Sequence, residues 1–407
     1  MTIAKIVEGE TVGVMVNNKL NPVIGAVNGM LIGAFNPLDN HSTRDEDNSI
    51  ATVQTATTDA ALTKITTIWD NLDIFHTNGY VELFDYSGSK RFGQASSLPT
   101  GNVNADYNQV CACVSFKFDG DMVSIQCLTG SVTGIYSISV DGTFIDKSGY
   151  VNVGAGFQGI QLDFGTAKPS GRVIRVYTAA TAAAILRVNT KPEHTCTNPN
   201  LSTKRVAFVA DSFGAFDDDP AQGWIPSIAD AFSWHNFLPN ATGGTGFVNN
   251  QGGAKYNYIE RIADIVTFDA EKLIVSCSIN DSGYSAAVIQ QAVEDYLAAV
   301  YTQLPNIEDV IILGPPGAYT TSNETNELAA LAAVNAFNTA NSKNVKFIRS
   351  QTQQPGGLVY GTGWVGSETG DGNADIYKVD EYHYNGNGHR YWVPPMIAEM
   401  VRQGVTY

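Results

Sequence analysis

At 407 residues the chain is longer than one ordinary hydrophobic core accommodates, and its length predicts two or three domains. Hydrophobic residues make up 43% and charged residues 16% of the chain, proportions typical of a globular protein and not of a disordered one. The net charge of −16, without any cluster of Lys and Arg, argues against a protein that binds the backbone of a nucleic acid.

The spacing of the cysteines and the hydropathy pattern argue against further classes of protein. The cysteines lack the paired CxxC spacing of a zinc site, so buried free thiols are predicted at Cys111, Cys113, Cys127, Cys196 and Cys277. No apolar run approaches the length that spans a bilayer, and no cleavable signal peptide opens the chain. We therefore expect no metal or other cofactor, no membrane insertion and no export by an ordinary cleaved signal.

Residues 1–50 form the first predicted segment. Residues 1–37 mix Val, Ile and Met with repeated Gly and Asn, which favours short β segments joined by turns. This stretch is too small to build its own core, so we expect it to serve oligomerisation or attachment to another protein. Beyond an exposed loop, residues 52–72 have the spacing and composition of a helix.

Short alternating runs between residues 79 and 188 predict a second domain, an antiparallel β-sandwich of the jelly-roll type over residues 51–195. The runs include CACVSFKF, MVSIQCL and RVIRVYT, and Gly, Asp and Ser separate them. Asp141 and Gly142, between YSISV and TFID, are typical of a tight hairpin turn. Such a domain can bind carbohydrate or pack against a catalytic domain, because a fold does not fix a function.

The polar stretch KPEHTCTNPNLS contains two prolines and marks the boundary to a third domain over residues 200–407. Apolar strand runs follow it, namely VAFVA, LIVSCS, DVIILG and VKFIRS. The spacing of apolar residues predicts helices at residues 225–234, 256–265, 286–304, 324–342 and 392–402. Apolar strands interleaved with helices predict a doubly wound α/β domain with a parallel sheet.

The strongest functional signal is Ser212 in the stretch KRVAFVADSFG. It directly follows a buried strand, at the sheet edge where open α/β sheets bind their ligands. Asp and Ser are also favoured helix caps, so a capping role explains the same residue. As a nucleophile, a neutral serine needs a base within hydrogen-bond reach.

A candidate base lies near the C-terminus, in VDEYHYNGNGHRYW. Asp380 precedes His383 by three residues, so its carboxylate can accept from one ring nitrogen while the other faces the serine. His389 is the competitor, but it lies in or beside the last helix and has no Asp at that offset, which favours a surface or capping role. We prefer His383.

Two further stretches offer hydrogen-bond donors for an oxyanion. Backbone N–H groups of Gly243, Gly244 or Gly246 in NATGGTGF can approach a ligand closely, because glycine has no side chain. The side-chain amide of Asn280, in SIND, follows the LIVSC strand. Each stretch alone is ordinary turn chemistry, but their positions after successive strands favour a shared site.

The stretches ADSFG, GGTG, SIND and DEYH, in this order, resemble the sequence blocks of the SGNH (GDSL-type) hydrolases over residues 204–402. The resemblance implies a triad of Ser212, Asp380 and His383. It also implies an oxyanion hole made by the N–H of Ser212, the N–H of Gly244 and the amide of Asn280.

Two positions depart from the family pattern. Ala210 and Ser278 stand where the family usually has glycine, which marks this chain as a divergent member. Both are small residues, so the two turns are expected to form.

Aromatic residues on loops are candidates for a wall that binds the substrate, since flat rings pack against sugar faces. Tyr360 and Trp364 lie in a glycine-rich loop, Tyr284 follows SIND, and Trp224 lies on another loop. A surface loop anchored by its aromatic rings explains the same pattern equally well.

An SGNH domain behind a β-sandwich resembles carbohydrate esterases, and the glycine-rich N-terminus adds a resemblance to phage tail-spike deacetylases. These resemblances imply a serine esterase that removes O-acetyl groups from capsule or O-antigen polysaccharide. They also imply a homotrimer attached to a virion tail through residues 1–50. A non-enzymatic glycan-binding receptor protein with a degenerate hydrolase domain, an esterase of small acyl substrates, and a thioesterase or lipase remain the alternatives.

Overall fold

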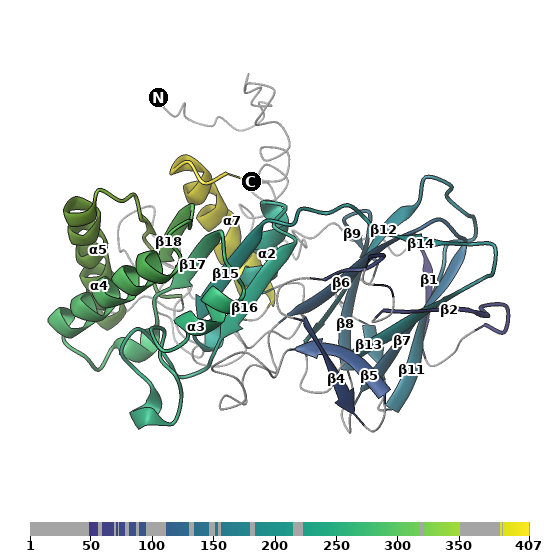
Figure 1. The fold of residues 1–407 in the computed structure, drawn as a ribbon, viewed down its shortest axis with the longest axis horizontal. Helices are drawn as coiled ribbons and strands as arrows, with labels where there is room; N and C mark the ends of the chain where they lie inside the picture. Colours follow the sequence, from purple (N-terminus) through teal and green to yellow (C-terminus); the bar gives the residue numbers. More distant parts are fainter. Residues whose placement is uncertain are drawn as a thin grey trace, which may run out of the picture.

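In a computed structural model of the protein, the structure describes residues 49–55, 59–68, 71, 73–77, 81–86, 89–94, 111–129, 134–145, 151–153, 156–179, 184–214, 223–316, 321–350, 383–384 and 386–406. Two antiparallel sheets come first in the chain and a parallel sheet with helices follows (Figure 1). Residues 1–48, for which attachment or oligomerisation is predicted, lie outside the described residues.

The antiparallel sheets share one buried core. The first consists of β1 (Thr52–Thr55), β11 (Gly156–Asp163), β7 (Met122–Thr129), β13 (Ala184–Thr190), β5 (Ser89–Gln94) and β4 (Val81–Tyr86), with β2 (Lys64–Thr67) beside β13. The second consists of β10 (Val151–Val153), β8 (Gly134–Val140), β12 (Arg172–Ala179), β6 (Ala112–Phe118) and β14 (Cys196–Thr197), with β3 (His76–Thr77) beside β6 and β9 (Thr143–Phe144) beside β8. Buried residues of both, such as Phe116 and Ile160, form the core, and the predicted sandwich is confirmed.

Two local predictions in this domain have opposite outcomes. Asp141 and Gly142 turn the chain between β8 and β9 with φ of 52° and 90°, as a tight hairpin requires. The helix predicted over residues 52–72 is wrong, because β1 and β2 lie there. β1 pairs with β11 and β2 pairs with β13, so pairing within a sheet outweighs the helical propensity of the segment.

The second half of the chain builds a five-stranded parallel sheet. Its order is β16 (Asn236–Ala241), β15 (Arg205–Ala210), β17 (Lys272–Ser276), β18 (Asp309–Leu313) and β19 (Lys346–Ile348). The four predicted strand runs are present. The sequence pattern missed β16 because Pro239 interrupts it, and an edge strand tolerates proline since one of its sides needs no ladder hydrogen bonds.

Helices cover both faces of this sheet: α2 (Trp224–Ala231), α3 (Ile262–Thr267), α4 (Ala286–Gln303), α5 (Thr321–Asn341) and α7 (Gly386–Arg402) (Figure 1). Along β15, Phe208 packs with α2 and α7, whereas Ala207 and Val209 pack with α3, α4 and α5. Burial of both faces explains why the strand runs are apolar without alternation. None of the described helices is long and apolar enough to cross a bilayer.

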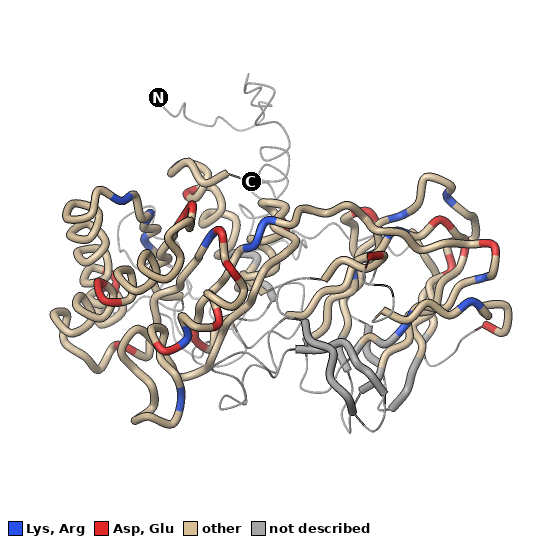
Figure 2. Tube along the Cα trace, viewed as in Figure 1, with Lys and Arg blue, Asp and Glu red and all other residues tan. Residues whose placement is uncertain are grey.

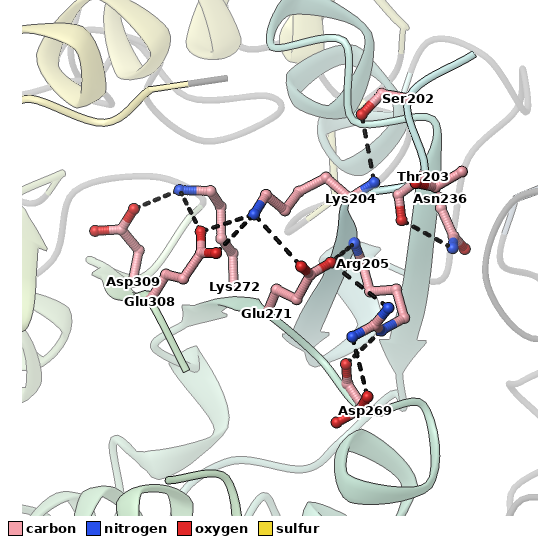
Figure 3. A network of polar contacts seen from close by, with 10 residues as sticks. All are labelled: Ser202, Thr203, Lys204, Arg205, Asn236, Asp269, Glu271, Lys272, Glu308 and Asp309. Carbon is pink, nitrogen blue, oxygen red and sulfur yellow. Dashed lines mark hydrogen bonds and ion pairs between the residues drawn. The ribbon is translucent and has the colours of Figure 1, made fainter. Parts of the chain in front are cut away.

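The amino ends of the parallel strands carry a network of ion pairs (Figure 3). Lys204 Nζ lies 2.7 Å from Glu308 Oε1, and Lys272 Nζ lies 2.5 Å from Asp309 Oδ2. Lys346 also contacts Asp309. Acidic and basic residues are otherwise interspersed over both halves of the molecule (Figure 2). The network ties neighbouring strands together at the edge opposite the one that follows Ala210, so the carboxyl edge is left for chemistry.

The sandwich packs directly on the α2 side of the parallel sheet. Cys111, Cys113 and Tyr177 share one buried core with Trp224 of α2. Arg175 Nη1 and Tyr177 Oη each lie 2.7 Å from a different carboxylate oxygen of Asp230 in α2. All five cysteines are free and buried, as predicted. The shared core and the partly buried ion pair make the two halves one packed unit, not two modules on a linker.

Two histidines face each other across this boundary. His76 of β3 and His235, which precedes β16, have ring centroids 6.5 Å apart. Burial, with the Arg175 charge as a second cause, lowers the pKa of His235 from 6.5 to about 4. Burial also lowers the pKa of His76. The interface therefore accepts both rings in the neutral form and opposes their protonation.

This arrangement predicts a loss of stability in mild acid. The unfolded chain binds a proton at His235 near pH 6.5 and the folded chain only near 4, so stability is lost as the pH falls from about 6.5 toward 4. We expect the melting temperature to fall over this range and to fall less in His235→Gln, with both proteins similar at pH 7.5. Thermal melts at half-unit steps of pH measure this. An equal fall in the two proteins would contradict the assignment.

Candidate active site

Ser212 lies in a tight turn at the carboxyl end of β15. It opens the 3-10 turn η2 (Ser212–Gly214), in which Asp211 Oδ1 accepts from the N–H of Phe213 and Asp211 O accepts from the N–H of Gly214. A Cβ atom at Gly214 would lie 2.8 Å from the Ala210 Cβ. Glycine at 214 therefore makes room for an alanine at 210, the position where the SGNH pattern usually has glycine.

His383 reaches Ser212 from a distance of 171 residues along the chain. Its Nε2 lies 2.8 Å from Ser212 Oγ, and its ring centroid lies 5.1 Å from that of Phe213. His383 comes just before α7, which packs on α2 through Trp392 and Trp224, whose ring centroids are 5.9 Å apart. The helix thus sets the place from which the imidazole meets the hydroxyl. Asp380 lies outside the described residues.

The contact has the geometry that proton transfer needs. In the tautomer with its proton on Nδ1, His383 accepts the Ser212 hydroxyl proton at Nε2, which makes the oxygen a nucleophile. Ser212 is 8% exposed, so most of this residue is shielded from solvent. The described residues contain no group of three or more His, Cys, Asp and Glu side chains that could hold a metal ion.

Two aromatic residues have other positions than predicted. His389 is buried within α7, with its ring centroid 5.8 Å from that of Tyr384, so the surface role expected for it is wrong. Trp224 is fully buried, so it cannot form a substrate wall, and its indole N–H donates to Phe213 O at 3.1 Å. Its hydrogen bond supports the turn that carries Ser212.

The remaining candidates for a substrate wall divide in two. Tyr284 is 40% exposed and follows the short turn η4 (Ile279–Asp281). Tyr360 and Trp364 lie outside the described residues. Their roles in binding remain predictions.

The glycine loop follows β16 beside Ser212. Gly246 donates its N–H to Asn249 O, so that donor is already used. Gly244 has φ of 75° and is partly exposed, whereas Gly243 is buried and its carbonyl accepts from Lys255 Nζ at 2.7 Å. Of the three glycines, Gly246 is therefore excluded as a donor, and Gly243 and Gly244 are left as candidate donors to a ligand.

Asp281 holds the far side of this loop. Its carboxylate accepts from the N–H groups of Phe247, Val248 and Asn249 at 2.9, 3.2 and 2.9 Å. Burial raises the pKa of Asp281 to about 6, against the opposing effect of these three hydrogen bonds. Asp281 is not among the site residues predicted from the sequence, although an Asp directly after a candidate oxyanion residue is a usable signal.

A buried arginine also stabilises the glycine loop, and no sequence signal pointed to this residue. Arg261 is fully buried, and its guanidinium carbon lies 4.8 Å from the centroid of the Tyr258 ring. It donates to Asn240 O and to Ala210 O at 3.0 and 3.1 Å, and to the hydroxyl of Thr245 at 3.3 Å. One cation therefore joins the ends of β15 and β16 and the glycine loop.

Asn280 lies between the turn that carries Ser212 and the glycine loop. Its Nδ2 is 2.9 Å from Ser278 Oγ, 3.2 Å from Thr245 O and 3.3 Å from Asp211 Oδ2. Asp211 is fully buried, and burial raises its pKa. The structure thus brings Ser212, the glycine loop, Asn280 and His383 to one edge of the sheet, which is the arrangement that an acyl-transfer site needs.

Solved structures with the same architecture are carbohydrate esterases and related enzymes. An acetyl xylan esterase (Est2A) from Butyrivibrio proteoclasticus is 13% identical, with a TM-score of 0.56 and coverage of 84% of this chain and 98% of that chain. A family two carbohydrate esterase from Clostridium thermocellum, solved in complex with cellohexaose, is 13% identical, with a TM-score of 0.57 and coverage of 81% and 98%. The protein shares their fold.

A protein from Bacteroides ovatus named as a GDSL-like lipase is similar as well, with 13% identity, a TM-score of 0.59 and coverage of 84% of this chain and 97% of that chain. The sequence matches no protein-family model and no curated protein. The resemblance to SGNH (GDSL-type) hydrolases is thus confirmed in the fold. It extends beyond the half of the chain that carries the sequence blocks, so the sandwich belongs to the shared architecture.

The packing of Asp281 against the glycine loop predicts a sharp difference between two glycines. A Cβ at Gly246 would lie 2.4 Å from both carboxylate oxygens of Asp281, whereas a Cβ at Gly283 would meet nothing within 4 Å. We expect Gly246→Ala to lower the free energy of unfolding by about 1–3 kcal/mol, and Gly283→Ala to leave it within about 1 kcal/mol of wild type. Urea titrations measure both. Equal stability of the two variants would rule out this packing.

Proposed function

We propose that the protein is a serine esterase that removes O-acetyl groups from a bacterial surface polysaccharide. The observation that carries the proposal is the 2.8 Å contact between Ser212 Oγ and His383 Nε2 at the carboxyl edge of a parallel sheet. A glycine loop and the Asn280 amide lie beside it. A hydroxyl in contact with an imidazole, next to several N–H donors, is the minimal equipment for nucleophilic acyl transfer.

The proposed reaction has two steps. Ser212 Oγ attacks the acetyl carbonyl carbon while His383 Nε2 takes its proton, and the carbonyl oxygen becomes an oxyanion. The intermediate collapses, the sugar oxygen leaves with the proton from His383, and an acetyl-serine remains. Water, deprotonated by His383, then attacks the acetyl-serine and releases acetate. Asp380 is assigned to accept from Nδ1 of His383 and to hold the ring in the required tautomer.

Three donors are assigned to the oxyanion: the N–H of Ser212, the N–H of Gly244 and the side-chain amide of Asn280. One such donor typically lowers the barrier by about 3 kcal/mol. The proposed steps involve the substrate ester, atoms of this chain and water.

The substrate class is inferred from the architecture. Est2A is named an acetyl xylan esterase, and the Clostridium thermocellum enzyme was solved with cellohexaose, so the shared two-domain fold supports a carbohydrate ester as substrate. Tyr284, exposed at the same edge as Asn280, is assigned to the sugar-binding wall together with Tyr360 and Trp364.

We further propose that the polysaccharide is a capsule or O-antigen and that the protein is a phage tail-spike or tail-fibre protein on the virion. The support is the segment of residues 1–50, which is too small to build its own core and is therefore expected to need a partner surface. The resemblance to phage tail spikes implies a homotrimer. Sedimentation of the full chain at micromolar concentration is expected to give a trimer, and a monomer would contradict this setting.

Ser212→Ala and His383→Ala are expected to abolish acetate release, with an effect on kcat of at least about 10³-fold and without loss of folding. Acetate is measured after incubation with acetylated capsules of several bacteria and with p-nitrophenyl acetate, and circular dichroism checks the fold. Val288→Ala, an exposed change on α4, is the control.

The same measurement separates the alternatives. Retained activity in either variant would remove that residue from the mechanism. A wild-type protein that binds the polysaccharide but cleaves no ester and resists a serine-directed reagent would be a glycan-binding receptor protein. A strong preference for long acyl chains would indicate a thioesterase or lipase.

A further inference from the structure

The hydroxyl of Ser278 touches each of the three stretches that surround the nucleophile. Its Oγ lies 2.6 Å from Asp211 Oδ2, next to Ser212, and 2.7 Å from Thr245 O in the glycine loop. It also lies 3.0 Å from the N–H nitrogen of Asn280 and 2.9 Å from the Asn280 Nδ2. Ser278 is 1% exposed, so water does not compete for these contacts.

The contacts use the full hydrogen-bonding capacity of this oxygen. Its two lone pairs accept from the backbone N–H and the side-chain amide of Asn280. Its proton faces two acceptors, Asp211 Oδ2 and Thr245 O. Burial raises the pKa of Asp211, and the hydrogen bond from Ser278 opposes this shift. A saturated hydroxyl of this kind fixes its neighbours more rigidly than a half-satisfied one.

The side-chain amide of Asn280 is the group whose orientation these contacts fix. The Nδ2 atom of Asn280 has three acceptors within reach, namely Ser278 Oγ at 2.9 Å, Thr245 O at 3.2 Å and Asp211 Oδ2 at 3.3 Å, and the contact with Ser278 is the shortest. Ser278 Oγ also accepts from the backbone N–H of Asn280, so it holds this residue at two points. Without the hydroxyl, only the two longer contacts would hold the amide, and its orientation would be less well fixed.

We propose that Ser278 is a positioning residue, which orients the Asn280 amide and the glycine loop toward the oxyanion of the acyl-transfer intermediate. The inference rests on the proposed esterase function. Ser278 acts through Asn280 and Thr245 and does not touch the reacting atoms. The SGNH pattern usually has glycine at this position. Glycine has no side chain, so the usual residue cannot provide the hydroxyl that this chain has here.

The test uses the full-length protein and a matched control. Ser276 is also buried, lies on β17 two residues earlier, and its Oγ donates to Cys277 O at 3.0 Å, away from the site. Ser278→Ala and Ser276→Ala therefore delete the same group, one at the N-cap of η4 and the other at the end of β17. For p-nitrophenyl acetate we expect Ser278→Ala to lower kcat on the order of 10- to 100-fold with KM within about threefold, and Ser276→Ala to change kcat less than about twofold.

A double-mutant cycle separates positioning from a merely structural role. If Ser278 acts through Asn280, its removal costs little once the amide is gone, so Ser278→Ala in an Asn280→Ala background should lower kcat less than about threefold further. The same loss with and without the amide would overturn the proposal. So would equal kcat in the Ser278 and Ser276 variants.

Two measurements keep the result decisive. If Ser278→Ala does not fold, Ser278→Thr and Ser278→Val form an isosteric pair in which only Thr keeps the hydroxyl. Activity in Thr and its loss in folded Val supports the proposal, whereas unfolding of every variant without the hydroxyl overturns it. If the wild type cleaves no ester, the proposed function fails. The rate at which a p-nitrophenyl phosphonate labels Ser212 then still compares Ser278→Ala with Ser276→Ala.

Discussion

The packing of α7 against α2 is the interaction on which the candidate site depends. Trp392 of α7 contacts Trp224 of α2 in a fully buried cluster, and His383 precedes α7 by only a few residues. The indole of Trp224 in turn donates to the backbone beside Ser212. One aromatic contact therefore fixes both partners of the contact between imidazole and hydroxyl, which are otherwise separated by most of the domain.

Buried polar groups then shape the sheet edge around Ser212. Asp281 holds the glycine loop by its backbone N–H groups, Arg261 ties that loop to the ends of two strands, and Ser278 joins it to Asp211 and Asn280. Buried groups of this kind are costly unless their partners are present, so the three residues stabilise one arrangement of the loop. This rigidity is what oxyanion stabilisation requires, because donors that are already oriented need no reorganisation during the reaction.

The β-sandwich also supports the elements around Ser212, so it is more than an appended module. Arg175 and Tyr177 of the sandwich bind Asp230 of α2, the helix that also supports the serine turn. The solved structures that share the fold are matched over both halves of the chain. His235, whose protonation is opposed by burial, lies at this same boundary, directly before β16 of the parallel sheet.

The order of elements and the residue types at strand ends were predictable from the sequence alone. Local patterns determine these, since the apolar runs of β15 and β17 and the Asp141–Gly142 turn depend on neighbours in the chain. Strand pairing decided β1 and β2, and an edge position allowed β16 to contain a proline. Only the tertiary structure showed that Trp224 is core, that Arg261 joins two strand ends, and that Ser278 contacts three stretches at once. The physical reason is that burial and hydrogen bonding between distant segments depend on how those segments pack in space. The local pattern of residues along the chain does not contain this information.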